Sequence, residues 1–207
     1  MEKPALRLKY LCRQNTATME SLLQDIRKCT ACRAQLPCPP RPILQASIHA
    51  KIMIIGQAPG RKVNDSGIPW DDLSGNELRR WLGVTKEQFY EPDLFALMPM
   101  GFCYPGTAKT GDLPPRPECA PLWHPKLLAE MTNIRLTLLI GQYAQKRYLG
   151  TAFNPTITEN VRNYRTFLPH YLPLVHPSPR NKIWQKKNPW FEQEVVPALR
   201  EIIGGMV

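Results

Sequence analysis

Side chains of four different chemistries lie close together in residues 176–181, whose sequence is HPSPRN. An imidazole, a hydroxyl, a guanidinium and an amide can together transfer protons, donate hydrogen bonds and bind anions. Two prolines restrict the backbone between these groups, so the loop holds them in place. Functional groups commonly lie on loops that a rigid scaffold positions. We therefore expect His176 to be catalytic, whereas the alternative for a single histidine is a structural role.

A glycine-bounded turn, with the sequence GQAPG over residues 56–60, follows an apolar run. Glycine lets backbone amides approach a ligand closely, and ligands of open α/β sheets bind at the carboxyl ends of the strands. The turn lacks the Lys-Ser/Thr pair of a phosphate-binding P-loop and the glycine spacing of a dinucleotide-binding fold. Both of these nucleotide-binding classes are therefore disfavoured.

Four of the six cysteines form two pairs, with two residues inside the first pair and fifteen inside the second. The pairs are Cys29 with Cys32, and Cys103 with Cys119. Thiolates at such spacing suit a [4Fe–4S] cluster or a tetrahedral zinc ion. The alternative is four unconnected buried thiols. Cys12 and Cys38 lie outside the pattern, although Cys38 is close enough to act as a substitute ligand.

The charge of the chain favours a polyanionic partner. Lys and Arg outnumber Asp and Glu by 27 to 17, which gives a net charge of +10. Such a surface binds phosphates with release of counterions, although a merely soluble basic surface is the alternative. We find no secretory signal and no apolar run of the ~18 residues that a membrane span needs. We therefore expect a cytoplasmic, monomeric protein that does not contact a membrane and whose cysteines are not paired in disulfides.

The elements that must position these groups are visible in the apolar pattern. Residues 51–55 and 136–140 are short, continuous apolar runs that end at glycine, and they indicate buried central strands. Residues 94–98 and 171–176 are weaker strand candidates. The expected helices cover residues 19–27, the segment from an N-cap at Ser74 to Gly83, and residues 125–131, 142–149 and 190–203.

This alternation predicts an α/β fold, a three-layer α/β/α arrangement with a mostly parallel central sheet of about four strands. We expect one domain over residues 1–207, with a helical N-terminal segment 1–45 as part of it. The polar turn at residues 56–60 and the HPSPRN loop then both follow strands. The carboxyl ends of parallel strands meet at one edge of the sheet, so we expect the two motifs to share a ligand site.

These motifs resemble the uracil-DNA glycosylase superfamily, which has a Gly-x-x-Pro turn after the first strand and a His-Pro-Ser-Pro-like loop after the last. The chain is most similar to the iron–sulfur branch, in which the turn reads Gly-Glu-Ala-Pro-Gly and is followed by Gly-x-Pro-Phe and a helix. That branch also carries four cysteines at the spacing found here. The corresponding segments are 56–60 and 67–70, whose sequences are GQAPG and GIPW. The resemblance covers roughly residues 25–200 and implies a [4Fe–4S] cluster, with zinc as the alternative.

The resemblance implies a DNA repair enzyme that flips a damaged base, usually uracil, out of DNA and hydrolyses its N-glycosidic bond. It implies that His176 donates to the base O2 and that Trp70 stacks on the base, with core packing as the alternative for Trp70. Ser178 would hold a flanking phosphate, and Arg180 with Pro179 would fill the gap left by the base. The implied substrate-binding residues are Gly56, Ala58, Pro59, Gly60, Trp70, Phe102, Ser178, Pro179, Arg180 and Asn181.

The chain departs from that branch at two points. Gln57 stands where the branch has a carboxylate, and an amide can orient water but cannot act as a base. Asp65 is then the best catalytic carboxylate in the first loop, with a solvated turn residue as the alternative. The asparagine that recognises uracil ahead of the third cysteine is replaced within residues 99–102, so the preferred base stays open, and Phe102 could take over part of the pocket.

Three other interpretations remain open. The protein could be an inactive glycosylase fold that only binds nucleic acid, or a metal- or redox-sensing protein that uses the four cysteines. His176 could also capture the abasic sugar covalently, although we find no equivalent of the basic insertion carried by the relative that does so. The sequence leaves open whether single- or double-stranded DNA is preferred.

Overall fold

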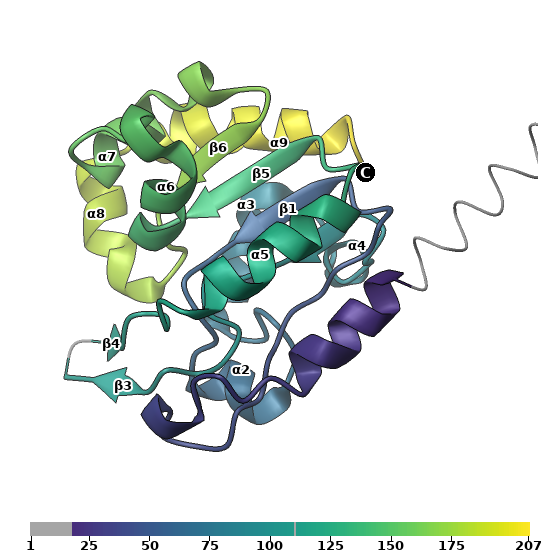
Figure 1. The fold of residues 1–207 in the computed structure, drawn as a ribbon. Coiled ribbons are helices and arrows are strands. Elements are labelled where there is room, and N and C mark those ends of the chain that lie inside the picture. The colour runs from purple at the N-terminus through teal and green to yellow at the C-terminus, as the bar shows by residue number, and fades with distance from the viewer. Residues whose placement is uncertain (1–17, 110) are drawn as a thin grey trace, which may run out of the picture.

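The computed structural model describes residues 18–109 and 111–207. In this part of the chain the central sheet contains four parallel strands in the order β2-β1-β5-β6 (Figure 1). Their bounds are Ile52–Ile55 for β1, Phe95–Leu97 for β2, Leu136–Ile140 for β5 and Tyr171–Leu174 for β6. Every residue of β1, β2 and β5 is buried, which explains their continuous apolar sequences. The predicted parallel sheet is confirmed.

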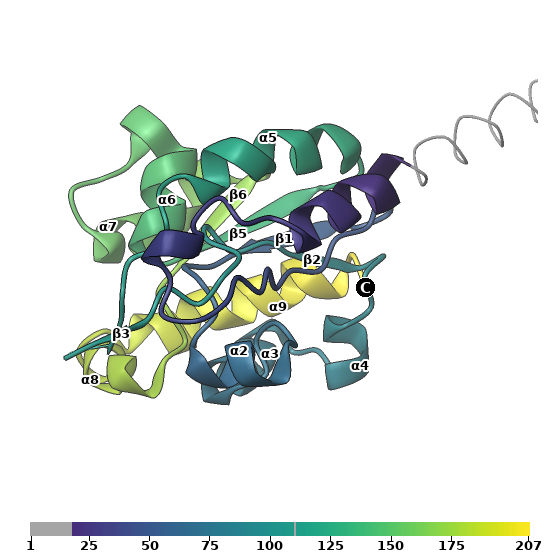
Figure 2. The same cartoon turned by 60° about the horizontal axis from the view of Figure 1, so that its bottom comes forward.

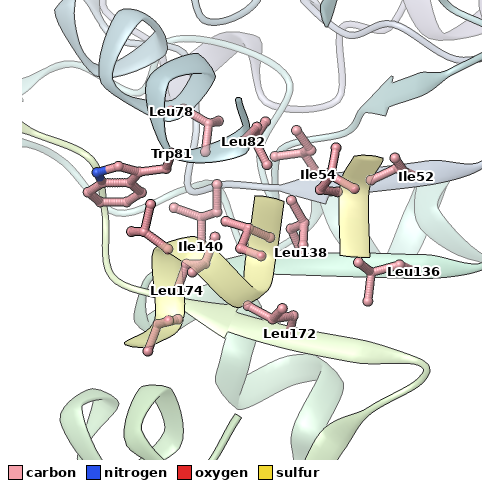
Figure 3. Close-up of a cluster of buried hydrophobic side chains, with 14 of the residues drawn as sticks. Ile52, Ile54, Leu78, Trp81, Leu82, Leu136, Leu138, Ile140, Leu172 and Leu174 are labelled. Atoms are coloured by element: carbon pink, nitrogen blue, oxygen red, sulfur yellow. The ribbon is translucent and has the colours of Figure 1, made fainter. Parts of the chain in front are cut away.

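Side chains alternate across β1 and enter two separate cores. Ile52 and Ile54 pack with α3 (Leu73–Leu82) and α9 (Val196–Gly204), as Figure 3 shows in part. Met53 and Ile55 pack on the opposite face with the helix of residues 18–27, α5 (Cys119–Glu130) and α6 (Gln142–Leu149). Figure 2 shows these two sets of helices on either side of the sheet. The result is the predicted three-layer α/β/α fold.

Shorter elements connect the main layers. None of the helices in residues 18–109 and 111–207 is long and apolar enough to cross a membrane. The remaining helical segments are 3₁₀ turns at Arg33–Gln35, Gly150–Ala152, Tyr164–Phe167 and Pro179–Asn181, a π-helical turn at Phe191–Val195, and the helices α2 (Arg61–Ser66), α4 (Lys86–Phe89), α7 (Ile157–Arg162) and α8 (Lys182–Lys187). A small antiparallel hairpin pairs β3 (Thr107–Ala108) with β4 (Gly111–Asp112).

Two predicted helix starts were wrong. The N-cap of α3 is Asp72, whose Oδ1 accepts a hydrogen bond of 2.8 Å from the amide of Gly75, and Ser74 lies inside the helix. Helix α5 begins at Cys119, six residues before the predicted start at Pro125. Pro125 removes one helical hydrogen bond and its ring crowds the preceding turn, yet α5 continues through it because its buried face packs in the core. The C-terminal end of α3 is confirmed, because Gly83 adopts a left-handed conformation with φ of 70°.

Candidate active site

A pocket of about 420 Å³ lies at the carboxyl ends of β1 and β6. The turn that follows β1 and the loop that follows β6 meet there, as their positions after parallel strands require. Ten of the residues expected at the site line it: Gly56, Gln57, Ala58, Pro59, Gly60, Trp70, His176, Ser178, Arg180 and Asn181. Asp65, Phe102 and Pro179 are not among its lining residues.

Trp70 and His176 form the centre of the pocket. Their rings stack with centroids 5.7 Å apart and planes 30° from parallel. Trp70 has φ of 59°, a left-handed conformation that bulky side chains rarely adopt. Two glycines make room for it, because a Cβ on Gly56 would lie 2.8 Å from Trp70 Cζ2 and a Cβ on Gly75 would lie 1.7 Å from the Trp70 carbonyl oxygen. Trp70 is half-buried, contacts the core and also lines the pocket.

His176 is held in a largely desolvated position. Its carbonyl oxygen accepts a hydrogen bond of 2.6 Å from Nδ2 of Asn181, which closes the loop on itself. Burial lowers the pKa of the His176 imidazole, and the negative charge of Asp72 opposes this shift. A lowered pKa favours the neutral ring at neutral pH, and a neutral imidazole carries one N–H donor and one acceptor nitrogen. The loop therefore presents a neutral hydrogen-bonding group to the pocket.

The carboxylates of the pocket differ from the one expected. Asp72 and Asp112 line it, whereas Asp65 faces solvent on α2 and forms an exposed ion pair of 3.8 Å with Arg61. Residues 61–66 form a helix, which turns Asp65 away from the site. Sequence reasoning missed Asp72 because the N-cap was assigned to Ser74. Asp112 was missed because the hairpin that carries it has strands of only two residues.

Gln57 lines the pocket, and its side chain is hydrogen-bonded within the protein. Its Nε2 donates a hydrogen bond of 3.0 Å to the carbonyl oxygen of Leu113, next to the hairpin. The backbone carbonyl oxygen of Gln57 accepts a hydrogen bond of 3.0 Å from the backbone amide of Gly101. A carboxylate at position 57 could not donate to Leu113, because ionised carboxylates only accept hydrogen bonds. The side-chain amide thus ties the first turn to Leu113, and the backbone carbonyl of the same residue ties it to Gly101.

Phe102 lies in the core and not in the pocket. Its side chain is 1% exposed and stacks on His124 with ring centroids 5.6 Å apart. It also lines a second cavity, together with Gly101 and Cys103 on either side of it in the sequence. Phe102 was expected to contribute to the substrate pocket, but the structure places it at the second cavity instead.

The second cavity brings the two cysteine pairs together, and its lining residues include Cys29, Cys32, Cys103 and Cys119. Burial raises the pKa of the Cys103 thiol to about 11 and that of Cys119 to about 12. Cys12 lies outside the described residues. Within those residues, no group of three or more His, Cys, Asp or Glu side chains has the geometry of a metal site.

The chemistry of the four side chains nevertheless fits a metal or cluster. Four thiols from three chain segments line one apolar cavity, and thiolates are the ligands that zinc and iron–sulfur centres take. Arg116 also lines this cavity, and its buried Nε has no hydrogen-bond partner in the structure. A guanidinium N–H in this position can donate to a thiolate or a sulfide, which would satisfy it.

The segment after the HPSPRN loop carries both basic and aromatic side chains, and the structure places the two kinds differently. Lys182, Lys186 and Lys187 are exposed on α8. Trp184 and Trp190 are half-buried, pack against the core and meet edge to face with centroids 5.8 Å apart. The lysines can contact phosphates, whereas the packing of the two indoles favours a structural role for them.

A comparison with protein-family models matches residues 44–200 to the Uracil DNA glycosylase superfamily. The match begins just before β1 and ends within α9, so it includes the sheet, the turn at residues 56–60 and the HPSPRN loop. The pocket at the carboxyl ends of β1 and β6 lies inside this region. The chain therefore belongs to the uracil DNA glycosylase superfamily.

Proposed function

We propose that this protein is a DNA repair glycosylase that hydrolyses the N-glycosidic bond of a flipped-out deaminated base, with uracil as the first candidate. The stacked pair of Trp70 and His176, with Asp72 in the same pocket, is the observation that carries this proposal. A base inside a duplex cannot be reached, so it must leave the stack and enter such a pocket. The net charge of +10 supports a DNA partner.

The pocket offers a group for each side of the reaction. A flat base stacks on the Trp70 indole, and the neutral imidazole of His176 donates a hydrogen bond to a carbonyl oxygen of the base. When the bond from C1′ to the base nitrogen breaks, its electron pair stays with the base. Positive charge develops on the sugar. The hydrogen bond from His176 stabilises the anionic base as it leaves.

Asp72 is the carboxylate that we assign to the sugar side. It is half-buried and lines the pocket, and its negative charge opposes the lowering of the pKa of His176 by burial. Its carboxylate stabilises the cationic sugar and orients a water molecule, whose oxygen forms the new bond to C1′. The proton released by the water neutralises the base anion. Ser178, Arg180 and the exposed lysines of α8 bind the flanking phosphates.

The four cysteines would hold the cofactor. We propose that Cys29, Cys32, Cys103 and Cys119 bind a [4Fe–4S] cluster, with zinc as the alternative. When bound, the group would cross-link three chain segments, because its ligands come from the N-terminal segment, the loop after β2 and the start of α5. Metal analysis and the visible absorption spectrum of anaerobically purified protein distinguish iron–sulfur from zinc.

Excision of uracil from a labelled oligonucleotide tests the activity. Wild-type protein should leave alkali-sensitive abasic sites in a single strand or opposite guanine, and His176→Ala should lower the rate about 10²- to 10⁴-fold. Asp72→Asn should lower it by a similar factor. His170→Ala, an exposed histidine outside the pocket, is the matched control and should keep the wild-type rate.

The same assay separates the alternatives. A folded, metal-loaded wild-type protein that excises neither uracil nor hypoxanthine contradicts the proposal. Retained affinity for abasic DNA would then indicate a protein that only binds nucleic acid. A DNA adduct that survives denaturation and requires His176 would instead show covalent capture of the abasic sugar.

A further inference from the structure

The hairpin of β3 and β4 forms a wall of the pocket. Gly111 and Asp112 line the pocket together with the turn after β1 and the loop after β6. A Cβ added to Gly60 would lie 3.2 Å from Oδ2 of Asp112, and one added to Gly111 would lie 2.6 Å from Nη1 of Arg180. The hairpin thus packs closely against both motifs. It brings a carboxylate to them from a segment that belongs to neither.

Several contacts fix the position of this carboxylate. The amide of Leu113 donates a hydrogen bond of 2.8 Å to Gly106, and the carbonyl oxygen of Leu113 accepts one of 3.0 Å from Gln57. The hydroxyl of Thr107 lies 3.5 Å from Oδ1 of Asp112 and within 2.5 Å of the Tyr104 hydroxyl. Asp112 is exposed as a residue, yet its carboxylate lies against the pocket walls. The resulting desolvation raises its pKa, and Arg180 opposes that shift.

Other polar side chains of the pocket already have partners inside the protein. Asp72 Oδ1 accepts from the amide of Gly75, and Gln57 Nε2 donates to Leu113. Asn181 Nδ2 donates to the carbonyl oxygen of His176 and Ser178 Oγ accepts from the amide of Arg180. These bonds shape the site. Asp112 adds an acceptor on the wall formed by the hairpin.

We propose that Asp112 is a specificity-determining residue, whose carboxylate accepts a hydrogen bond from the ring N–H of a deaminated base. This inference rests on the proposed glycosylase function. Uracil and hypoxanthine each carry a ring N–H beside a carbonyl group. Cytosine has an unprotonated ring nitrogen at the corresponding place, so its lone pair faces the carboxylate. A carboxylate acceptor at this wall favours a base that presents an N–H there and disfavours one that presents a lone pair, because two acceptors repel each other. Gln57 is a positioning residue in this assignment, since it holds the hairpin in place.

Binding of uncleavable substrates tests this assignment independently of catalysis. The probes are single-stranded oligonucleotides with one 2′-fluoro-2′-deoxyuridine or one 2′-fluoro-2′-deoxycytidine, and the readout is Kd by fluorescence anisotropy. Wild-type protein should prefer the uracil probe at least about 10-fold, the factor expected for a hydrogen bond to a charged group. Asp112→Ala should reduce the preference to about twofold or less and leave the Kd for a tetrahydrofuran abasic analogue unchanged. Asp25→Ala, an exposed carboxylate on the helix of residues 18–27, should match the wild type.

A second variant protects the test against a folding defect. Asp112→Asn keeps the size of the side chain, and its amide can turn to accept from uracil or to donate to cytosine. It should therefore bind both probes with reduced discrimination and melt at the wild-type temperature. An unchanged preference in Asp112→Ala, or no preference in the wild type, overturns the proposal. Wild-type protein that discriminates through Asp112 but excises nothing would refute the glycosylase function and leave Asp112 as a residue that recognises the base in a binding protein.

Discussion

The candidate active-site pocket and the cysteine cavity both include residues of the segment that follows β2, yet their linings differ. The pocket is polar, and its groups come from loops at strand ends. The cavity contains buried thiols among apolar side chains such as Phe102 and Trp123. Burial lowers the pKa of His176 in the pocket and raises the pKa of Cys103 in the cavity, so in both places it favours the neutral form. Under the proposed function, the pocket carries the chemistry and the cavity holds a group that cross-links the chain.

The largest effect should come from removing a thiol. Cys103→Ser should abolish the visible absorption of the proposed cluster and lower the free energy of unfolding by several kcal/mol, because structural metal sites contribute directly to folding. Metal content and urea denaturation measure both effects. His176→Ala serves as the opposite control, with activity lost and stability kept. A Cys103→Ser variant with wild-type stability would contradict the structural role of the cavity.

Gly75→Ala should displace Trp70 and so impair the pocket, although residue 75 lies in helix α3 and not among the lining residues. The new Cβ would lie 1.7 Å from the carbonyl oxygen of Trp70, so the backbone that holds the indole must move. We expect about a 100-fold loss in kcat/KM, since small displacements of a binding group weaken catalysis strongly. The loss of stability should be about 1–3 kcal/mol, as for other overpacked sites. Gly204→Ala, which meets no atom within 4 Å, is the neutral control.

Acid should destabilise the protein through His124, which lies between the two regions. Its Nδ1 lies 2.6 Å from the Tyr148 hydroxyl and its Nε2 lies 3.1 Å from the carbonyl oxygen of Pro99. Burial lowers the pKa of His124 to about 4, so the unfolded chain binds a proton more readily than the folded one. Stability is therefore lost as the pH falls from about 6.5 towards 4. We expect about 2 kcal/mol of loss between pH 7 and pH 5 from this group.

Urea denaturation at the two pH values measures this contribution. The loss should be about 2 kcal/mol smaller in His124→Gln than in the wild type, because glutamine does not titrate. The difference between the two proteins removes the contribution of the carboxylates, which they share. Equal pH dependence in both would show that His124 titrates normally in the folded state.

The smallest effect is expected from a change at Gln57, whose side chain links the turn at residues 56–60 to Leu113 beside the hairpin. Gln57→Glu restores the carboxylate of the iron–sulfur branch but removes the donor to Leu113 and places a negative charge beside its carbonyl oxygen. We expect about a 10-fold lower excision rate, which corresponds to about 1.4 kcal/mol and to the loss of one hydrogen bond. A higher rate in this variant would instead indicate that position 57 is the natural place of the catalytic base.

The ends of β1 and β5 could be predicted from the sequence because burial on both faces leaves a strong pattern, whereas β6 ends at Leu174, two residues before the predicted end at His176. The strand at residues 136–140 has the predicted bounds, and His176 and the turn at residues 56–60 meet because parallel strands bring their carboxyl ends to one edge. The carboxylates could not be predicted in this way. Asp72 was missed because the helix cap lies two residues before the predicted one. Asp112 was missed because its place at the pocket depends on the long-range packing of a hairpin that has no apolar periodicity.

The hairpin has a further consequence for how such an enzyme can diverge. Thr107, Ala108 and Asp112 are exposed and Gly111 is half-buried, so its two strands place no side chain in either core. Substitutions at Thr107, Ala108 or Asp112 alter a wall of the pocket at little cost to folding, since changes of exposed side chains usually shift stability by less than about 0.5 kcal/mol, whereas Gly111 is constrained by its φ of 141° and by Arg180. Under the proposed function, the base preference can therefore change through these three residues while the sheet, the stacked rings and the cysteine cavity stay as they are.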